Sequence, residues 1–167
     1  MSDLVSFCES AHGRATSLLN RLQSPLLLLI RLYWGWQFAQ TGWGKLHHLD
    51  HVTEFFTSLN LPAPATTALM VGLIEFIGGI LFAFGVGSRI VSLVLFVNMT
   101  VAYWTADHEA LLGIISAPDK FYAADPYTFW FAALIILVFG PGAIAVDWFI
   151  AQRRGFARAP RAHIVMS

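Results

Sequence analysis

The residue with the clearest capacity for chemistry is Glu75, a carboxylate in the middle of the apolar run VGLIEFIGGILFAFG at residues 71–85. An acidic side chain at the centre of a membrane helix costs roughly 2.5–3.5 kcal/mol on insertion scales, so such residues normally face a bundle interior and have partners. Its chemistry suits transfer of a proton or direct contact with a bound ligand. A polar contact that merely clamps two helices is the alternative interpretation.

Three further polar residues fall at comparable depth if the surrounding apolar runs are helices. Counted at about 1.5 Å per residue from one common end, Glu75, Asn98 and Gln37 lie about 15, 13 and 18 Å deep, and Arg31 lies about 9 Å deep. The sequence therefore predicts a polar layer near the midplane of a membrane. We expect Arg31, Gln37 and Asn98 to contact a ligand there, with clamping of the bundle as the alternative for Gln37 and Asn98.

The partner of Glu75 is left open by the sequence. Arg31 is long enough to reach it, but side chains lean toward the N-terminus of their own helix, so on antiparallel helices Arg31 and Glu75 lean in opposite directions. The other arrangement has a protonated Glu75 that forms hydrogen bonds with Asn98 or Gln37, because burial disfavours the charged form.

Aromatic residues crowd the same apolar run as Arg31. Tyr33, Trp34 and Trp36 are deep enough to line an apolar slot beside Glu75, and we expect Tyr33 and Trp34 to contact a ligand. The adjacent glycines at 78–79 allow a backbone or a flat ring to approach closely. Core packing of the aromatic residues is the alternative.

Metal and thiol chemistry have little support. His47, His51 and Glu54 recur at i, i+4 and i+7, which on one helix can bind a divalent cation, but no HExxH motif accompanies them. We therefore expect no metal site. The only cysteine, Cys8, excludes dithiol chemistry within one chain.

The elements that position these residues follow from composition. The chain is 57% hydrophobic and 12% charged, whereas soluble domains carry about 25% charged residues. Its formal net charge of +0 does not suggest a nucleic-acid partner. A bilayer core needs about 20 apolar residues in a helix. Four stretches meet this requirement, at about residues 25–43, 66–85, 89–105 and 126–140.

The predicted fold is all-α, an integral membrane four-helix bundle with antiparallel up-down topology over residues 25–150. Apolar residues at helical spacing predict an amphipathic interfacial helix over residues 1–24, and a basic cytoplasmic tail follows at residues 151–167. Lys and Arg are enriched in cytoplasmic loops. Seven of them fall on the side of the termini and two on the opposite side, which places both termini in the cytoplasm.

The order of several motifs resembles a known family. RLYWGWQFAQTGWGKL, LNLPAPA, EFIGGILFAFGVGSR and GPGAIAVD follow one another between about residues 25 and 148. In this order they resemble the DoxX family of small four-span bacterial membrane proteins, which includes DoxD-like subunits of thiosulfate:quinone oxidoreductases. The residues that match the family pattern are Arg31, Gly35, Gly42, Lys45, Glu75, Gly78, Gly79, Arg89 and Asp147. The Arg and Ser of a GxGRxSLD-type ending are absent.

The resemblance implies a multi-pass subunit of a quinone-linked redox system in the bacterial cytoplasmic (inner) membrane, with oxidation of sulfur compounds as one such system. Quinone is then the expected cofactor, Glu75 the catalytic residue, and a peripheral redox enzyme the expected partner besides lipid. We expect no catalysis by the chain alone. A non-enzymatic membrane scaffold and, less favoured, a small transporter are the alternatives, and the sequence leaves a homo-oligomer open.

Overall fold

The computed structural model describes the backbone of residues 2–153, together with the side chains of those residues except 2–11, 14, 15 and 18. Over this part of the chain all regular structure is helical. The predicted all-α class is therefore confirmed. The predicted basic tail lies outside the described residues from residue 154 onward.

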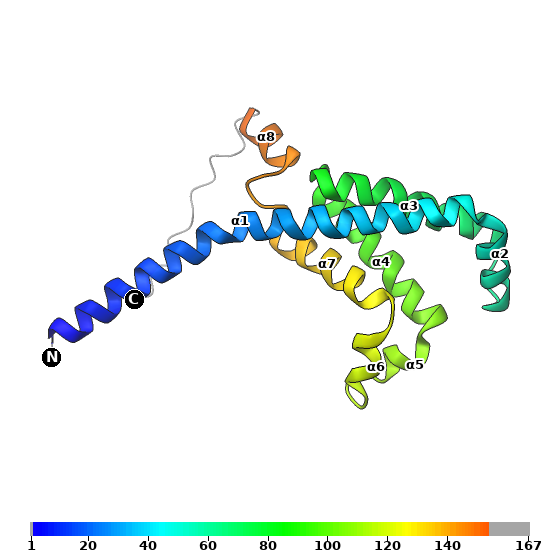
Figure 1. Ribbon diagram of the computed structural model, residues 1–167, viewed down its shortest axis with the longest axis horizontal. Coiled ribbons are helices and arrows are strands. Elements are labelled where there is room, and N and C mark those ends of the chain that lie inside the picture. Colours follow the sequence, from blue (N-terminus) through cyan, green and yellow to red (C-terminus); the bar gives the residue numbers. More distant parts are fainter. Residues whose placement is uncertain (1, 154–167) are drawn as a thin grey trace.

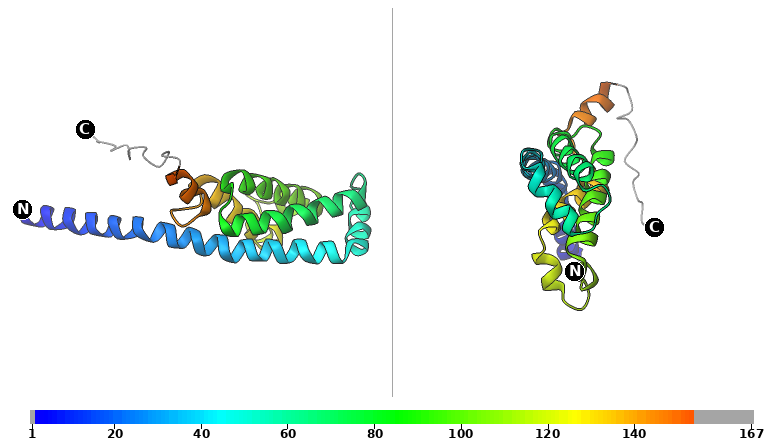
Figure 2. Two further views of the ribbon diagram at one scale, coloured as in Figure 1. Left: turned by 90° about the horizontal axis from the view of Figure 1, so that it is seen from above. Right: turned by 90° about the vertical axis from the view of Figure 1, so that its right-hand side faces the viewer.

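The first helix, α1, spans Ser2–His47 and continues through Pro25 without a break. The predicted interfacial helix and the predicted first span are therefore one continuous helix of 46 residues. Its C-terminal half packs in the bundle, while its N-terminal half projects well beyond it (Figures 1 and 2). The interfacial location of residues 1–24 stays a prediction.

Seven shorter helices follow α1. Proline opens α3, α6 and α7 within their first turn, where its missing N–H group leaves no hydrogen bond unmade. Gly85, with φ +71°, ends α3 in the left-handed conformation. These helices are α2 (Leu49–Ser58), α3 (Pro64–Phe84), α4 (Ser88–Ala106), α5 (His108–Leu112), α6 (Pro118–Ala123), α7 (Pro126–Phe139) and α8 (Val146–Arg153).

Four helices pack together around one apolar core. α1 packs along α3 and α4 along α7, and these two pairs meet where α3 contacts α4 and α1 contacts α7. Phe38, Phe82, Leu95 and Ile136, one residue from each of the four helices, are fully buried between them. α2 lies against α3 at the end of the bundle where α1 finishes (Figure 1).

Two helices, α3 and α4, are long and apolar enough to cross a membrane. Large apolar side chains on both are exposed, including Ile77 and Val97, as expected for surfaces in contact with lipid. The other two predicted spans do not have both the length and the hydropathy expected of a helix that crosses a membrane. α7 is apolar but has only 14 residues, because the chain turns at Gly140. α1 contains Arg31 and Gln37, which lower its mean hydropathy.

Glycines set the distance between α1 and α3. A Cβ added at Gly35 would lie 2.7 Å from the carbonyl oxygen of Gly79, and one added at Gly79 would lie 2.7 Å from that of Gly35. Both distances are far below ordinary contact, and the atoms met are backbone atoms that cannot turn aside. The two helices can approach this closely only because neither residue has a side chain.

We therefore expect Gly79→Ala to destabilise the protein by about 1–3 kcal/mol, because the two backbones must move apart. Gly44→Ala is the matched control: nothing lies within 4 Å of a Cβ added at Gly44 on α1. This change should be neutral or stabilising, since alanine favours a helix by up to about 1 kcal/mol. Thermal unfolding of both variants in detergent measures the difference, and equal effects would contradict the close crossing.

Candidate functional site

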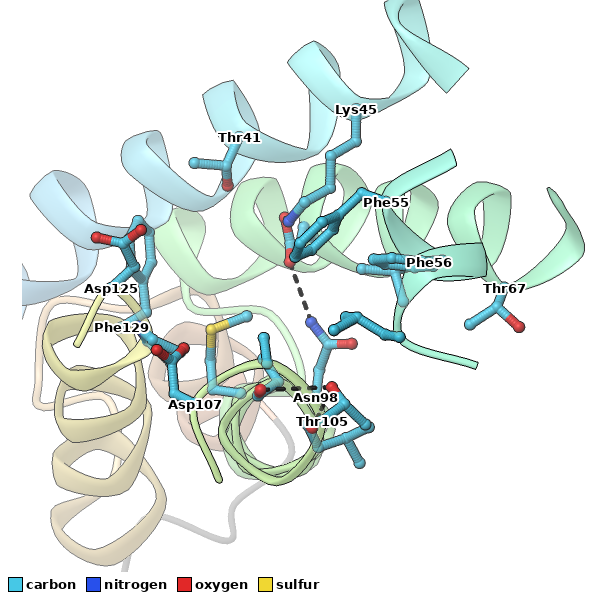
Figure 3. A pocket seen from close by; sticks show the side chains of 18 of the residues that line it. Thr41, Lys45, Phe55, Phe56, Thr67, Asn98, Thr105, Asp107, Asp125 and Phe129 are labelled. Carbon is cyan, nitrogen blue, oxygen red and sulfur yellow. Dashed lines mark hydrogen bonds and ion pairs between the residues drawn. The ribbon is translucent and has the colours of Figure 1, made fainter. Parts of the chain in front are cut away.

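A cavity of about 910 Å³ opens among α1, α3, α4 and the N-terminal end of α7, with α2 along one side (Figure 3). Most of its wall is apolar or aromatic, including Phe56, Val71, Met99 and Phe129. Its polar side chains come from separate helices and face the same space: Gln37, Thr41, Lys45, Thr67, Glu75, Asn98, Thr105, Asp107, Asp125 and Thr128. A mainly apolar cavity with a small set of polar groups is the usual form of a small-molecule site.

Three polar side chains meet in the wall of this cavity. The ammonium group of Lys45 on α1 forms an ion pair with Oε2 of Glu75 on α3. Asn98 on α4 donates a hydrogen bond from Nδ2 to Oε1 of Glu75 over 3.2 Å (Figure 3). Glu75 is 1% exposed, so its carboxylate depends on these two donors in place of water.

Lys45 is the site residue that sequence reasoning missed. The sequence marks it only as a match to the family pattern, whereas its side chain reaches back into the bundle to Glu75. The lean of side chains toward the N-terminus of their own helix is the signal that would have found it. On the antiparallel helices α1 and α3, that lean brings Lys45 and Glu75 toward each other, and the same rule carries Arg31 away.

Of the two arrangements that the sequence left open, direct pairing of Arg31 with Glu75 is not found. Glu75 does accept a hydrogen bond from Asn98, but its cationic partner is Lys45, which neither arrangement included. Arg31 is fully buried at the opposite end of the bundle, where its Nη2 donates to the carbonyl oxygen of Ile144. Its Nε and Nη1 have no hydrogen-bond partner among the described residues. Arg31 lies outside the lining of the cavity in which it was expected to contact a ligand.

The remaining predicted residues divide by helix face. Trp34 and Gln37 line the cavity together with Lys45. Gln37 follows Trp34 by three residues and precedes Lys45 by eight, and both spacings return to the same side of α1. Tyr33 is 60% exposed and points away from the cavity, since it lies about 100° around the helix from Trp34. Its edge packs on the Trp34 ring at a centroid distance of 5.0 Å.

The histidine and carboxylate pattern of the first loop does not form one helix face. α1 ends at His47 and α2 begins at Leu49, so His47 is on a different helix from His51 and Glu54. The Nδ1 atom of His47 lies 3.0 Å from the carbonyl oxygen of Trp43. Among the described residues, no group of three or more His, Cys, Asp or Glu side chains is placed to hold a metal ion.

Comparison with known proteins identifies the family of the chain. The family model DoxX matches residues 26–108, which include Lys45, Glu75 and Asn98. A protein of Bacillus subtilis (strain 168) named "Putative oxidoreductase CatD" is 30% identical over 117 residues, which cover 61% of this chain and 86% of that relative. The chain belongs to the DoxX family. No solved structure matches it significantly.

This DoxX protein has a second polar centre, at the end of the bundle opposite the cavity. Asp147 of α8 accepts hydrogen bonds from the backbone N–H groups of Gly87 and Ser88 over 2.8 and 2.7 Å and so caps the N-terminus of α4. Burial by itself would raise the pKa of Asp147, but the hydrogen bonds from Ser88 and Gly87 and the charge of Arg31 lower the pKa below its usual value.

The Lys45–Glu75 pair should behave as a coupled unit. We expect Lys45→Met to destabilise the protein on the order of 3 kcal/mol, because it leaves a buried carboxylate without its cation. Glu75→Gln should cost less, about 1–2 kcal/mol, because the Lys45 side chain is 29% exposed and retains contact with water. The double variant should lose at most half of the stability that the two single variants lose in sum.

Thermal unfolding of the four proteins of this cycle in detergent gives the coupling between the two residues. Lys120→Met, on exposed Lys120 of α6, is the control for loss of a lysine. Strictly additive losses in the double variant would show that the two side chains do not interact.

Asp147 should stabilise the fold at neutral pH but not in acid. Its pKa in the folded protein lies below the ordinary value of 3.8, so its contribution is present above pH 3.8 and is lost as the pH falls through the folded value. We expect Asp147→Ala to cost about 1–2 kcal/mol at pH 7, as other lost helix caps do.

The comparison is made by unfolding the wild type and Asp147→Ala at pH 7, 5 and 3. The difference between them should narrow at pH 3. Asp50→Ala, at an exposed position of α2, is the control. A difference that is unchanged from pH 7 to pH 3 would contradict the role of the ionised cap.

Proposed function

We propose that this DoxX protein is the integral membrane subunit of a quinone-linked oxidoreductase and that the quinone headgroup binds in the cavity beside Lys45, Glu75 and Asn98. The observation that carries the proposal is the buried carboxylate with its ammonium partner in the wall of a mainly apolar cavity. A quinone has the matching chemistry, since it is a flat apolar ring with carbonyl oxygens that accept hydrogen bonds. The name of the Bacillus relative supports a redox role.

Reduction of a quinone to a quinol takes up two electrons and two protons. The chain supplies the binding site and the groups that handle protons. With a quinone bound there, Lys45 would hold a carbonyl oxygen by a hydrogen bond, and Glu75 would accept and pass on a proton beside it. The electrons come from a peripheral redox subunit, for which oxidation of a reduced sulfur compound is one source.

We further propose four membrane crossings, made by residues 25–43 of α1 together with α3, α4 and α7. Support comes from exposed leucines on α1, at positions 26, 29 and 32, which are placed to contact lipid. In the cytoplasmic membrane of a bacterium, the excess of basic residues near the termini puts both termini in the cytoplasm. The cavity then lies toward the outer face.

A second candidate function is a non-enzymatic scaffold for a peripheral enzyme or for a second copy of the chain. The observation that favours it is the N-terminal half of α1, which extends beyond the bundle and offers a helix for docking (Figure 2). A scaffold needs no ligand in the cavity. It needs a partner bound in stoichiometric amounts.

The deciding experiment is mass spectrometry of the organic extract of the purified protein. We expect quinone near one equivalent per chain in the wild type and a loss of at least tenfold in Asn98→Leu and Glu75→Gln. Tyr33→Leu is the matched control, because Tyr33 lies on the same helix outside the cavity, and it should retain quinone. Phospholipid content serves as the reference for non-specific extraction.

The same ratio of quinone to phospholipid in all four proteins would overturn the quinone site. Two results together would then support the scaffold. A stoichiometric partner purifies with both the wild type and Glu75→Gln, and stability is the only property that this variant loses.

A further inference from the structure

The bundle has two polar centres with a layer of apolar side chains between them, and the buried polar side chain of Ser92 on α4 lies on the Arg31 side of that layer. Lys45, Glu75 and Asn98 form one centre, in the wall of the cavity. Arg31 and Asp147 belong to the other, where α8 meets the start of α4. Between the two lies the fully buried cluster of Phe38, Phe82, Leu95 and Ile136, one from each helix of the bundle.

The lining of the cavity reaches the end of the bundle that carries α2, α5 and α6, where it includes Leu59, Asp107 and Asp125. The groups at this end of its lining include Asp107, which follows α4 and is half-buried, and Asp125, which precedes α7 and is exposed. The two carboxylates come from the connections at the ends of different helices and lie near each other at one side of the cavity (Figure 3). Thr105, two residues before Asp107, belongs to the same lining.

We propose that water and cations, protons included, reach the Lys45–Glu75 pair from this end alone, through an entrance whose charge is set by Asp107 and Asp125. The four fully buried apolar side chains described above block access from the opposite end of the bundle. A proton cannot cross such a layer without a chain of polar groups or water. Two carboxylates at the entrance attract cations and repel anions.

The titration of Asp107 supports its place at the entrance. Burial, and then the negative charge of Asp125, raise the pKa of Asp107 above its usual range. The other titratable groups around Asp107 are Tyr103 on α4, Tyr127 on α7, and His108 and Glu109 on α5. A carboxylate with a raised pKa exchanges protons closer to neutral pH, as a group that passes protons inward needs to do.

The consequence for redox chemistry rests on the proposed function. Each quinone reduced in the cavity takes its two electrons from the peripheral redox subunit and both protons from the end that carries α2, α5 and α6. Oxidation of a quinol in the same cavity releases two protons to that end. The quinone half-reaction therefore exchanges protons with only one side of the membrane.

The test is thiol labelling from each side of sealed vesicles, in the full chain with Cys8→Ala. Asn98→Cys and Thr105→Cys place a thiol in the cavity. Ser92→Cys places one at a fully buried position of α4 nearer the other end. Exposed Gln152 on α8 supplies Gln152→Cys as the control for access from that end. A membrane-impermeant methanethiosulfonate is added outside or trapped inside.

We expect both cavity thiols to react at least tenfold faster from the end of α2 than from the end of α8, and Gln152→Cys to show the reverse. Ser92→Cys should react slowly from both. Comparable labelling of Asn98→Cys from the α8 end would overturn one-sided access. None of these outcomes depends on quinone, so loss of the quinone site and loss of one-sided access are separate results.

The entrance charge is tested with the same thiols and a pair of reagents of opposite charge. A trimethylammonium methanethiosulfonate should label Thr105→Cys faster than a sulfonate analogue. Asp107→Asn should reduce the ratio of the two rates roughly fivefold, as loss of a nearby charge in water predicts. Glu109→Gln, which removes a carboxylate from an exposed position of α5 outside the cavity lining, should change the ratio little. An unchanged ratio in Asp107→Asn would overturn the role of that carboxylate.

Discussion

The arrangement of this protein depends on one constraint, the placement of a carboxylate inside an apolar bundle. Glu75 is almost completely buried, and a buried charge persists only when it is paired and hydrogen-bonded. Lys45 and Asn98 meet that requirement from two different helices. The ion pair therefore fixes the rotation of α1 about its axis and the register of α1, α3 and α4 with one another. Removal of Lys45 leaves a buried charge without a cation, and removal of Asn98 leaves Oε1 of Glu75 without its hydrogen bond.

The glycines of α1 and α3 make this contact possible. At the crossing near Gly35 and Gly79 the two backbones touch, so the two helices stay close over several turns. Larger residues there would separate the helices, and the ammonium group of Lys45 would no longer reach Glu75. The close approach of α1 and α3 thus has a chemical consequence: it brings a lysine from the helix end into the wall of the cavity. The family match includes both helices, from residue 26 to 108.

Sequence reasoning recovered the chemistry of single residues better than their partners. The depth of Glu75 predicted a buried carboxylate, and equal depth linked it correctly to Asn98. Trp34 and Gln37 were also predicted beside it, and both line the cavity. Depth along a helix can be counted from the sequence, since the rise per residue is constant. The class of fold followed from composition and hydrophobic length.

The errors concern rotation, helix ends and long-range contacts. Tyr33 was grouped with Trp34 by depth, although adjacent residues point about 100° apart on a helix. The long helix α1 continues through Pro25, which apolar length alone did not predict. Arg31 was expected near Glu75, but its hydrogen-bond acceptor lies 113 residues away in sequence, at Ile144. No local pattern predicts where the segment after α7 returns to the bundle.

The two polar centres give the bundle opposite properties at its two ends. At one end, Arg31 is fully buried beside Gly85 and donates to the carbonyl oxygen of Ile144, while the half-buried Asp147 accepts hydrogen bonds from the start of α4, so the two hold the connection between α3, α4 and α8 in place. At the Lys45 and Glu75 end, the same kinds of groups border open space. The difference is therefore one of surroundings and not of burial, since Glu75 is as deeply buried as Arg31. A charged group beside a cavity has space next to it for a ligand, whereas, among the described residues, Arg31 and Asp147 contact only the protein segments that they hold together.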